Sequence, residues 1–228
     1  MNMAKAITNA TPPPACPHCG AESEDVHFCS ACGKILPLAA GSDYFSFFGL
    51  PRKLRLDESA LETNFYALSR QLHPDYFMNA SDAERQASVE RASRLNDAHR
   101  TLRNRTARAQ YLLSLAGYKE AEKKAPPDLL EEVFELNMQI EELKAAKQMS
   151  DEDEVQVARA ALEGALEGLK SKLNDIDARL FASFADWDAA VDRGADEQER
   201  KPVLDRMSEL LSHRSYIRNL VRDIKEEL

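Results

Sequence analysis

Pro74 is the residue that most constrains how this chain can fold. The apolar residues before it recur at the spacing of one helix face: Leu61, Phe65, Leu68 and Leu72. Proline disfavours the α conformation in the preceding residue and has no N–H to donate, so the helix should end at or before His73. A second helical pattern begins after Ser81, which can cap it together with Glu84. The sequence therefore predicts a helix–loop–helix hairpin that presents His73 and Asp75 at its bend.

All the cysteines of the chain lie in two Cys-x-x-Cys-Gly pairs: Cys16, Cys19, Cys29 and Cys32. The spacing within each pair lets both thiolates reach one ion, and the glycine permits the tight turn that follows. Together the thiolates make a tetrahedral set, so we predict a zinc module over residues 16–36 that needs its metal to fold. A pair of disulfides and a rubredoxin-type iron site are the alternatives. We expect His18 and His27 to be surface residues and not ligands.

The charge balance limits the possible partners. The 228 residues include 30 Lys and Arg against 39 Asp and Glu, a formal net charge of −9, which argues against a general nucleic-acid-binding protein. No apolar run is as long as a membrane span, and residues 1–15 lack the apolar core of a signal peptide. Lys5 is the only charged residue among them, so we expect no Arg-rich presequence, unless the chain has already been processed. We therefore expect no membrane partner, a cytoplasmic location, and disorder over residues 1–15.

The sequence after the cysteines carries helical patterns, which predict an all-α protein. Residues 35–42 are expected to be a linker, because they contain the helix breakers Pro37 and Gly41. Residues 43–117 form the first helical domain, and residues 128–228 form a three-helix bundle. The expected helices of this bundle span residues 128–149, 151–183 and 202–227 and carry coiled-coil-like apolar seams.

Three finer expectations concern helix ends and charge. Ser150 with Asp153 resembles a capping box for the middle helix of the bundle. A short extra turn should begin at Trp187 and be broken by Gly194. The arginines of residues 81–108 are expected to form a solvated helical face: Arg85, Arg91, Arg94, Arg100, Arg103, Arg105 and Arg108.

The first helix of the bundle carries more apolar surface than one core face needs. At about 100° per residue, one face holds Leu129, Val133, Leu136, Ile140 and Leu143. Leu130, Phe134 and Met138 form a separate stripe, and Glu135 and Glu142 are among the acidic residues beside it. Apolar residues with an acidic border on a solvent face suggest a protein-binding patch. The alternative is that a neighbouring helix covers this stripe.

His73-Pro74-Asp75 is the signature tripeptide of J domains, the co-chaperone modules that act on DnaK-class chaperones. The flanking sequences agree, since residues 43–50 resemble the short first helix of a J domain and residues 96–102 resemble its third helix. Residues 105–113 resemble the helix that joins the J domain to the C-terminal domain in the HscB family, also called Jac-type. The chain is therefore similar to HscB proteins, which serve iron–sulfur cluster assembly, and some relatives carry a comparable tetracysteine extension.

The resemblance implies a co-chaperone with two partners and no covalent chemistry of its own. His73, Pro74 and Asp75, with Arg70 beside them, would bind the ATPase of a DnaK- or HscA-class chaperone. The family's binding surface for the IscU-type scaffold protein, carried over position by position, corresponds to Leu130, Phe134, Glu135, Met138, Glu142 and Tyr216. Holding both partners would raise the concentration of scaffold at the chaperone.

The helix before the tripeptide departs from the usual J-domain pattern, and two alternative functions stay open. J domains usually present basic residues on the helix before the tripeptide, whereas Arg70 is the only basic residue between Leu56 and Leu72. The first rival is a J-domain co-chaperone for a different client. The second is a redox sensor, in which oxidation of the thiols releases zinc and changes the action on the chaperone.

Overall fold

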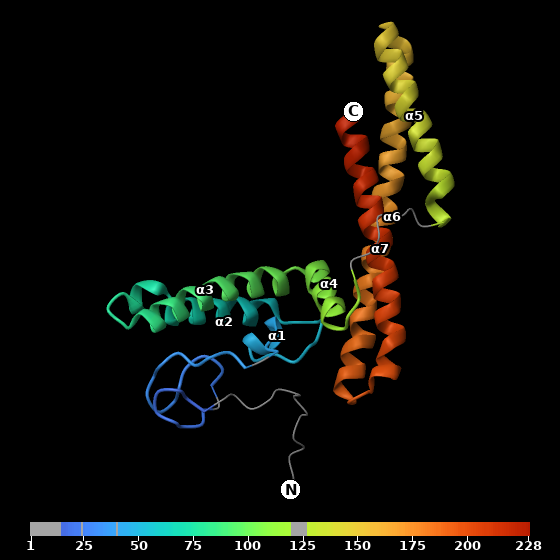
Figure 1. The fold of residues 1–228 in the computed structure, drawn as a ribbon. Helices are drawn as coiled ribbons and strands as arrows, with labels where there is room; N and C mark the ends of the chain where they lie inside the picture. The colour runs from blue at the N-terminus through green and yellow to red at the C-terminus, as the bar shows by residue number, and fades with distance from the viewer. Residues whose placement is uncertain (1–14, 24, 40, 120–126) are drawn as a thin grey trace. The chain divides into compact units, whose positions relative to one another are not determined.

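The computed structural model describes residues 15–23, 25–39, 41–119 and 127–228, and across these ranges the regular elements are all helices. They are α1 (Tyr44–Phe47), α2 (Glu58–Gln71), η1 (Pro74–Phe77), α3 (Asp82–Arg103), α4 (Arg105–Leu115), η2 (Pro127–Leu129), α5 (Leu130–Met149), α6 (Glu152–Asp192) and α7 (Glu197–Glu227) (Figure 1). Within the described ranges no helix is both long and apolar enough to cross a bilayer. The expected all-α class is confirmed. The disorder expected over residues 1–15 concerns, apart from Ala15, residues outside the described part.

The chain divides into two compact units, which we describe separately. The first contains the residues up to Leu112 together with Trp187–Asp196, and the second contains Leu113–Asp186 and Glu197–Leu228. The helix α6 therefore contributes to both units.

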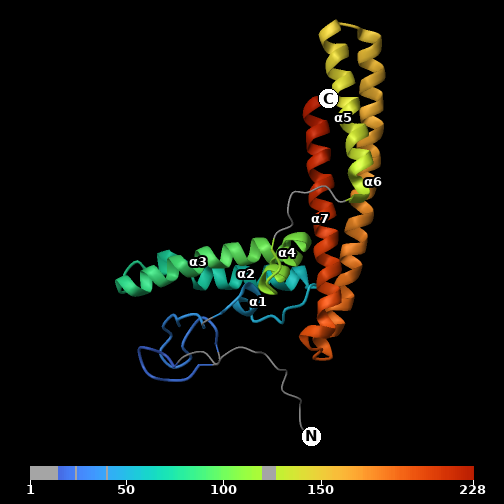
Figure 2. The same cartoon turned by 45° about the vertical axis from the view of Figure 1, so that its right-hand side comes forward.

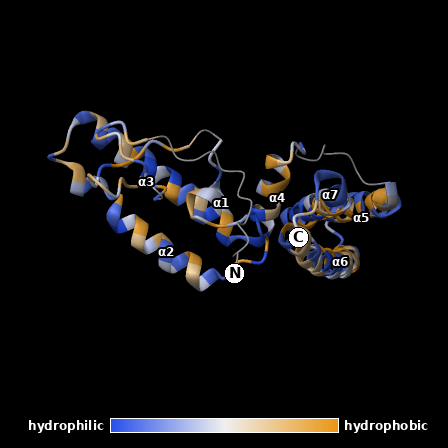
Figure 3. Cartoon of the chain, turned by 90° about the horizontal axis from the view of Figure 1, so that it is seen from below, coloured by the Kyte–Doolittle hydropathy of each residue, from blue (hydrophilic) through white to orange (hydrophobic). Residues whose placement is uncertain are grey.

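The hairpin predicted around Pro74 is present in the first unit. Asp57 caps α2 by accepting hydrogen bonds from the N–H groups of Ser59 and Ala60, both at 3.0 Å, and the helix ends at Gln71. Ser81 caps α3 as expected by accepting from the N–H of Glu84. The helices α2 and α3 lie side by side in antiparallel order (Figure 1), and bands of hydrophobic and hydrophilic residues alternate along α2 (Figure 3).

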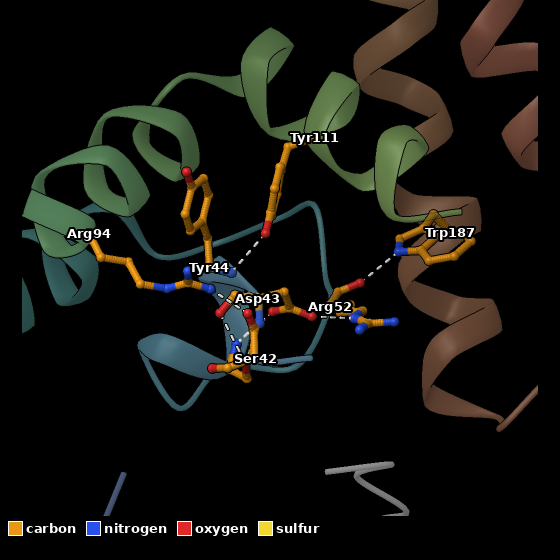
Figure 4. Close-up of polar contacts among 8 residues, drawn as sticks. Ser42, Asp43, Tyr44, Arg52, Arg94, Tyr111 and Trp187 are labelled. Atoms are coloured by element: carbon orange, nitrogen blue, oxygen red, sulfur yellow. Dashed lines mark hydrogen bonds and ion pairs between the residues drawn. The ribbon is translucent and has the colours of Figure 1, made fainter. Parts of the chain in front are cut away.

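A polar network holds α1 against α3 and α4 (Figure 4). Asp43 caps α1 in a capping box with Ser46 and also pairs with Arg52 at 2.6 Å. The hydroxyl of Tyr111 accepts from the N–H of Tyr44 at 3.0 Å, and Arg94 donates to the carbonyl of Ser42. These directional bonds fix the orientation of α1, whose Phe45 and Phe47 are fully buried.

The C-terminal end of α6 joins the first unit through two side chains. The indole N–H of Trp187 donates to the carbonyl of Arg52 at 2.7 Å (Figure 4), and the buried carboxylate of Asp188 accepts from the N–H groups of Leu54 and Arg55 at 2.7 and 2.9 Å. The separate turn expected at Trp187 is therefore wrong. Because this segment is buried and hydrogen-bonded, the helical conformation of α6 is stabilised as far as Asp192, and the helix ends before Gly194.

Three helices form the second unit. Figures 1 and 2 show α6 running antiparallel to α5 and α7. The residues of the expected apolar seam of α6 are buried or half-buried along its length: Val155, Ala158, Leu162, Ala165, Leu169, Leu173, Ile176 and Leu180. Arg214, which interrupts the apolar seam of α7, pairs with Asp177 of α6 at 2.5 and 3.2 Å. The pairing explains how a charged residue is accommodated between these helices.

Two expected helix boundaries in this unit are wrong. Ser150 adopts a left-handed conformation (φ 54°) at the end of α5, and Asp151 caps α6 by accepting from the N–H of Glu154 at 3.1 Å. The last helix begins at Glu197 and contains Pro202, although proline usually ends a helix. The proline removes a single backbone donor, and α7 continues to bury Leu204 and Met207 directly after it.

The solvated arginine face is also only partly correct. Arg91 and Arg108 are buried, and their guanidinium groups donate to the main-chain carbonyls of Leu36 and Leu102. Burial lowers the pKa of Arg91 to about 10. Arg85 and Arg100, in contrast, form exposed ion pairs with Asp82 and Asp97, as expected of a solvated face.

Replacing Asp188 with Ala should destabilise the first unit by about 1–3 kcal/mol, because the N–H groups of Leu54 and Arg55 would lose their shared acceptor. Denaturant unfolding measures this difference. Asp192→Ala is the matched control, since this exposed carboxylate makes only an ion pair with Lys53 and should change stability far less. Equal effects of the two substitutions would contradict the role given to Asp188.

Candidate functional site

The two cysteine pairs fold into matching turns. The N–H of Gly20 donates to the carbonyl of Cys16, and the N–H of Gly33 donates to the carbonyl of Cys29, both at 2.8 Å. Both glycines have positive φ values, 74° and 70°, as predicted for the turns after Cys19 and Cys32. The same local sequence thus produces the same turn twice and aims its thiols at a common point.

The four thiols fit one tetrahedral metal ion. Their sulfur atoms all lie within 4.8 Å of one another, and two pairs, Cys16 with Cys32 and Cys19 with Cys29, are 3.6 Å apart. A tetrahedral zinc site with Zn–S bonds of about 2.3 Å places its sulfurs roughly 3.8 Å apart. None of the thiols forms a disulfide. The N–H of Cys32 lowers the pKa of the Cys29 thiol to about 7, whereas burial and the neighbouring thiols, acting against the N–H of Lys34, raise the pKa of the Cys32 thiol to about 12. Cys29 therefore ionises more readily than Cys32.

The surroundings of this site differ from expectation. His27 is buried, not at the surface: its Nε2–H donates to the carbonyl of Phe47 at 2.9 Å and its ring packs edge-on against that side chain. Burial lowers the pKa of His27 and so favours the neutral ring. Ile35 and Leu36, assigned to a linker, are buried as well, and Leu36 packs against Cys16 and Cys29. His18 is exposed, as expected.

The predicted chaperone-binding residues lie together at the bend of the hairpin. His73 caps η1, because its Nδ1 accepts the N–H of Asp75 at 3.2 Å; the neutral ring must then carry its proton on Nε2. The side chains of His73 and Asp75 are 51% and 77% exposed, so both are available to a partner. A surface hollow of about 370 Å³ is lined by Ser69, Arg70, His73, Asp75 and Tyr76. Arg70 thus shares one surface with the tripeptide.

Sequence reasoning missed two residues at this loop. Ser88 of α3 is fully buried and donates to the carbonyl of Leu72, the residue before His73, at 2.7 Å. Its signal in the sequence is weak, because a serine at a core position of a helix does not stand out from solvent-facing serines. Tyr76, which follows the tripeptide, is 74% exposed and lines the hollow; an aromatic residue within a polar loop could have identified it.

The apolar stripe of α5 is exposed to solvent. Leu130, Phe134 and Met138 are 55%, 65% and 48% exposed, whereas Leu136 and Leu143 of the same helix are buried. Glu135 and Glu142 are exposed beside the stripe. In the described structure no neighbouring helix buries the stripe, so the alternative of a covered stripe does not hold.

Tyr216 of α7 lies at the level of this stripe. Lys147 of α5 donates to the carbonyl of Glu227 of α7 at 2.7 Å, and the two helices run in the same direction (Figure 2). Tyr216 comes eleven residues before Glu227, and residue 136 comes eleven before Lys147. Equal rise along both helices therefore places Tyr216 beside the middle of α5, between the levels of Phe134 and Met138. The tyrosine is half-buried.

The comparisons with known proteins agree with these features. No protein-family model matches the chain. A curated relative, the co-chaperone protein HscB homolog of Azoarcus sp. (strain BH72), is 42% identical over 112 residues, which are 48% of this chain and 63% of the relative. The match therefore spans less than two thirds of that protein.

Two solved structures share the fold. The crystal structure of human co-chaperone protein HscB has a TM-score of 0.66 at 24% identity and covers 93% of this chain and 98% of that one. Chaperone HscB from Vibrio cholerae has a TM-score of 0.55 at 28% identity, with 81% and 96% covered. The chain therefore shares its fold with two HscB structures and is similar in sequence, over about half of its length, to a curated HscB homolog.

Proposed function

We propose that this protein is a J-type co-chaperone of iron–sulfur cluster assembly. It stimulates the ATPase of a DnaK- or HscA-class chaperone and delivers an IscU-type scaffold protein to it. The single observation that carries this proposal is the exposed tripeptide His73-Pro74-Asp75 at the bend of the α2–α3 hairpin, in a chain that is similar to an HscB homolog.

The loop has the chemistry for binding a chaperone. The carboxylate of Asp75 is exposed and can accept a charge-assisted hydrogen bond from a partner arginine, while Arg70 on the same hollow can donate to a partner carboxylate. Neither step forms or breaks a covalent bond in this chain. We therefore propose a regulator of a partner's ATPase and not an enzyme.

The scaffold is proposed to bind α5 through its exposed stripe. Leu130, Phe134 and Met138 offer apolar surface, Glu135 and Glu142 supply a polar rim, and Tyr216 lies at the same level of the bundle. Interfaces are typically built from a few such anchors surrounded by polar residues. The stripe and the tripeptide loop belong to different compact units, and we propose that one chain binds both partners.

We further propose that the metal of the tetracysteine module is zinc, held by Cys16, Cys19, Cys29 and Cys32. The fit of the sulfur positions to a closed tetrahedral thiolate site supports zinc in a structural role. Free thiols of this kind suit a reducing compartment, and we retain the cytoplasm as the proposed location.

The variant His73→Gln should abolish stimulation of the chaperone ATPase and leave the fold intact, because the side chain is exposed and has no core contact. Steady-state ATPase rates of an HscA- or DnaK-type chaperone measure the effect. Asn79→Ala, an exposed substitution near the same bend, should stimulate normally. Normal stimulation by His73→Gln would refute the assignment of this loop.

Metal analysis of the purified protein should find about one zinc ion per chain, since four thiolates complete one closed site. Replacing Cys19 with Ser should lower this content strongly, whereas Ser30→Ala, between the cysteines but without a thiolate, should not. Iron in place of zinc, or full metal content in the cysteine variant, would count against the zinc site.

Replacing Leu130, Phe134 and Met138 together with Ala should weaken scaffold binding strongly, with little change in melting temperature. These side chains are exposed, so their truncation opens no cavity, whereas Leu136→Ala in the buried face should cost about 2–5 kcal/mol. Val157→Ala, an exposed apolar residue of α6, is the control that should change neither property. Calorimetric titration with the scaffold and thermal unfolding give both readouts. A large loss of stability would show that the stripe belongs to the hydrophobic core. An unchanged affinity would show that the scaffold binds another surface.

A further inference from the structure

The buried face of α3 changes character along its length. Its C-terminal half is mainly apolar, with Leu95, Ala98 and Leu102. Its N-terminal half buries three polar residues at the same helical spacing: Glu84, Ser88 and Arg91. Buried polar groups require partners. Besides the local bond from the hydroxyl of Ser81 to Glu84, each of these three contacts a different residue outside the helix.

Two of the three partners belong to the tetracysteine module. Glu84 forms an ion pair with Lys34 at 2.7 Å, and Arg91 donates to the carbonyl of Leu36. The interaction with Lys34 lowers the pKa of the Glu84 carboxyl. Both contacts therefore connect α3 to the short segment that follows the last cysteine of the module.

The cysteine turns themselves organise this segment. The carbonyl of Lys34 accepts the N–H of Cys29 at 2.8 Å, and the side chain of Leu36 packs against Cys16 and Cys29. The N–H of Leu36 donates to the carbonyl of His27 at 2.8 Å. A change in the cysteine turns would thus move the groups that contact Glu84 and Arg91.

The third partner is the loop that carries the tripeptide. Ser88 donates to the carbonyl of Leu72, which ends α2 and precedes His73. The 3-10 turn that follows uses the His73 carbonyl instead, which accepts the N–H of Tyr76 at 3.0 Å. Ser88 supplies the buried donor that fixes the direction in which the chain leaves α2, and with it the position of His73.

We propose that Ser88, Arg91 and Glu84 are positioning residues that connect the metal module to the tripeptide loop. A metal-loaded module holds the N-terminal half of α3 through Arg91 and Glu84, and Ser88 on the same face holds the loop in its chaperone-binding conformation. Loss of either connection leaves the hairpin folded but lowers the fraction of molecules with a competent loop. The effect on the chaperone rests on the proposed function, whereas the effect on the loop does not.

Ser88→Ala tests the link between α3 and the loop, because it removes the hydroxyl with almost no change of volume. Leaving the Leu72 carbonyl unsatisfied should speed amide hydrogen exchange in residues 72–78 roughly tenfold, with residues 95–103 unchanged as an internal reference. Ser88→Thr, which keeps the hydroxyl, should restore protection. Ser93→Ala, at an exposed position of the same helix, should have no effect.

The same variants separate positioning from a direct contact with the chaperone. A lower competent fraction raises the apparent dissociation constant by the same factor. The concentration of Ser88→Ala protein that gives half-maximal ATPase stimulation should therefore rise by the factor by which the competent fraction falls, while the plateau rate stays that of the parent. A lower plateau with unchanged exchange would overturn the proposal.

Arg91→Ala and removal of the metal by a chelator test the link to the module. Both should speed exchange in residues 72–78, and Arg91→Lys should restore part of the protection, because it keeps a donor for Leu36. Arg100→Ala, which removes an exposed ion pair of α3, should change nothing. If Arg91→Ala unfolds the hairpin, Lys34→Ala removes the other contact from the module side.

The failures of the two proposals are distinguishable. Unchanged exchange of residues 72–78 after metal removal and in Ser88→Ala would refute the positioning role, whatever the ATPase assay shows. A parent protein that stimulates no chaperone, with exchange changes as expected, would refute the proposed function alone.

Discussion

The buried face of α3 is the surface on which the described parts of the first unit depend. Its apolar half packs with α2, and burial of this kind is strong but not directional. Its polar half is directional, because Glu84, Ser88 and Arg91 each bond a specific atom: a carboxylate to Lys34, a hydroxyl to the Leu72 carbonyl, and a guanidinium to the Leu36 carbonyl. A mispositioned partner would leave a buried polar group unsatisfied, which costs more than a looser apolar contact. One helix therefore supplies both the stability of the hairpin and the geometry of its bend.

The features that sequence predicted correctly follow local rules. The helix α2 ends shortly before Pro74, Ser81 caps the next helix by accepting from the N–H of Glu84, and each Cys-x-x-Cys-Gly forms its turn within a few residues. The exposed stripe of α5 also follows from helix periodicity, since two apolar faces more than a quarter turn apart cannot both meet one core. These interactions join residues that are at most a few positions apart, so a short stretch of sequence contains both interacting residues.

The features that sequence could not predict join residues far apart in the chain. Asp188 accepts from Leu54 and Arg55, 134 and 133 residues away, and Arg91 bonds the carbonyl of a residue 55 positions earlier. In the sequence, an aspartate or arginine that will be buried cannot be told from one that will be exposed. Only the folded structure shows whether the side chain is buried. The end of α6 and the start of α7 differ from the prediction for the same reason: Trp187 and Asp188 gain tertiary partners that outweigh local turn signals, and helix packing outweighs Pro202.

The two proposed binding surfaces differ in the physics they use. The tripeptide loop presents polar groups whose hydrogen bonds to a partner depend on direction. The conformation of the loop must therefore be fixed, and in our proposal the polar face of α3 fixes it. The stripe of α5 presents apolar area, which gains roughly 25 cal/mol for each Å² removed from water in almost any orientation. Exposed side chains such as Phe134 contribute little to folding, because they stay in water in the folded chain. The free energy gained by burying them is therefore available for binding a partner. The loop needs neighbouring residues to fix its conformation and the stripe does not, and the two lie in separate units of the chain.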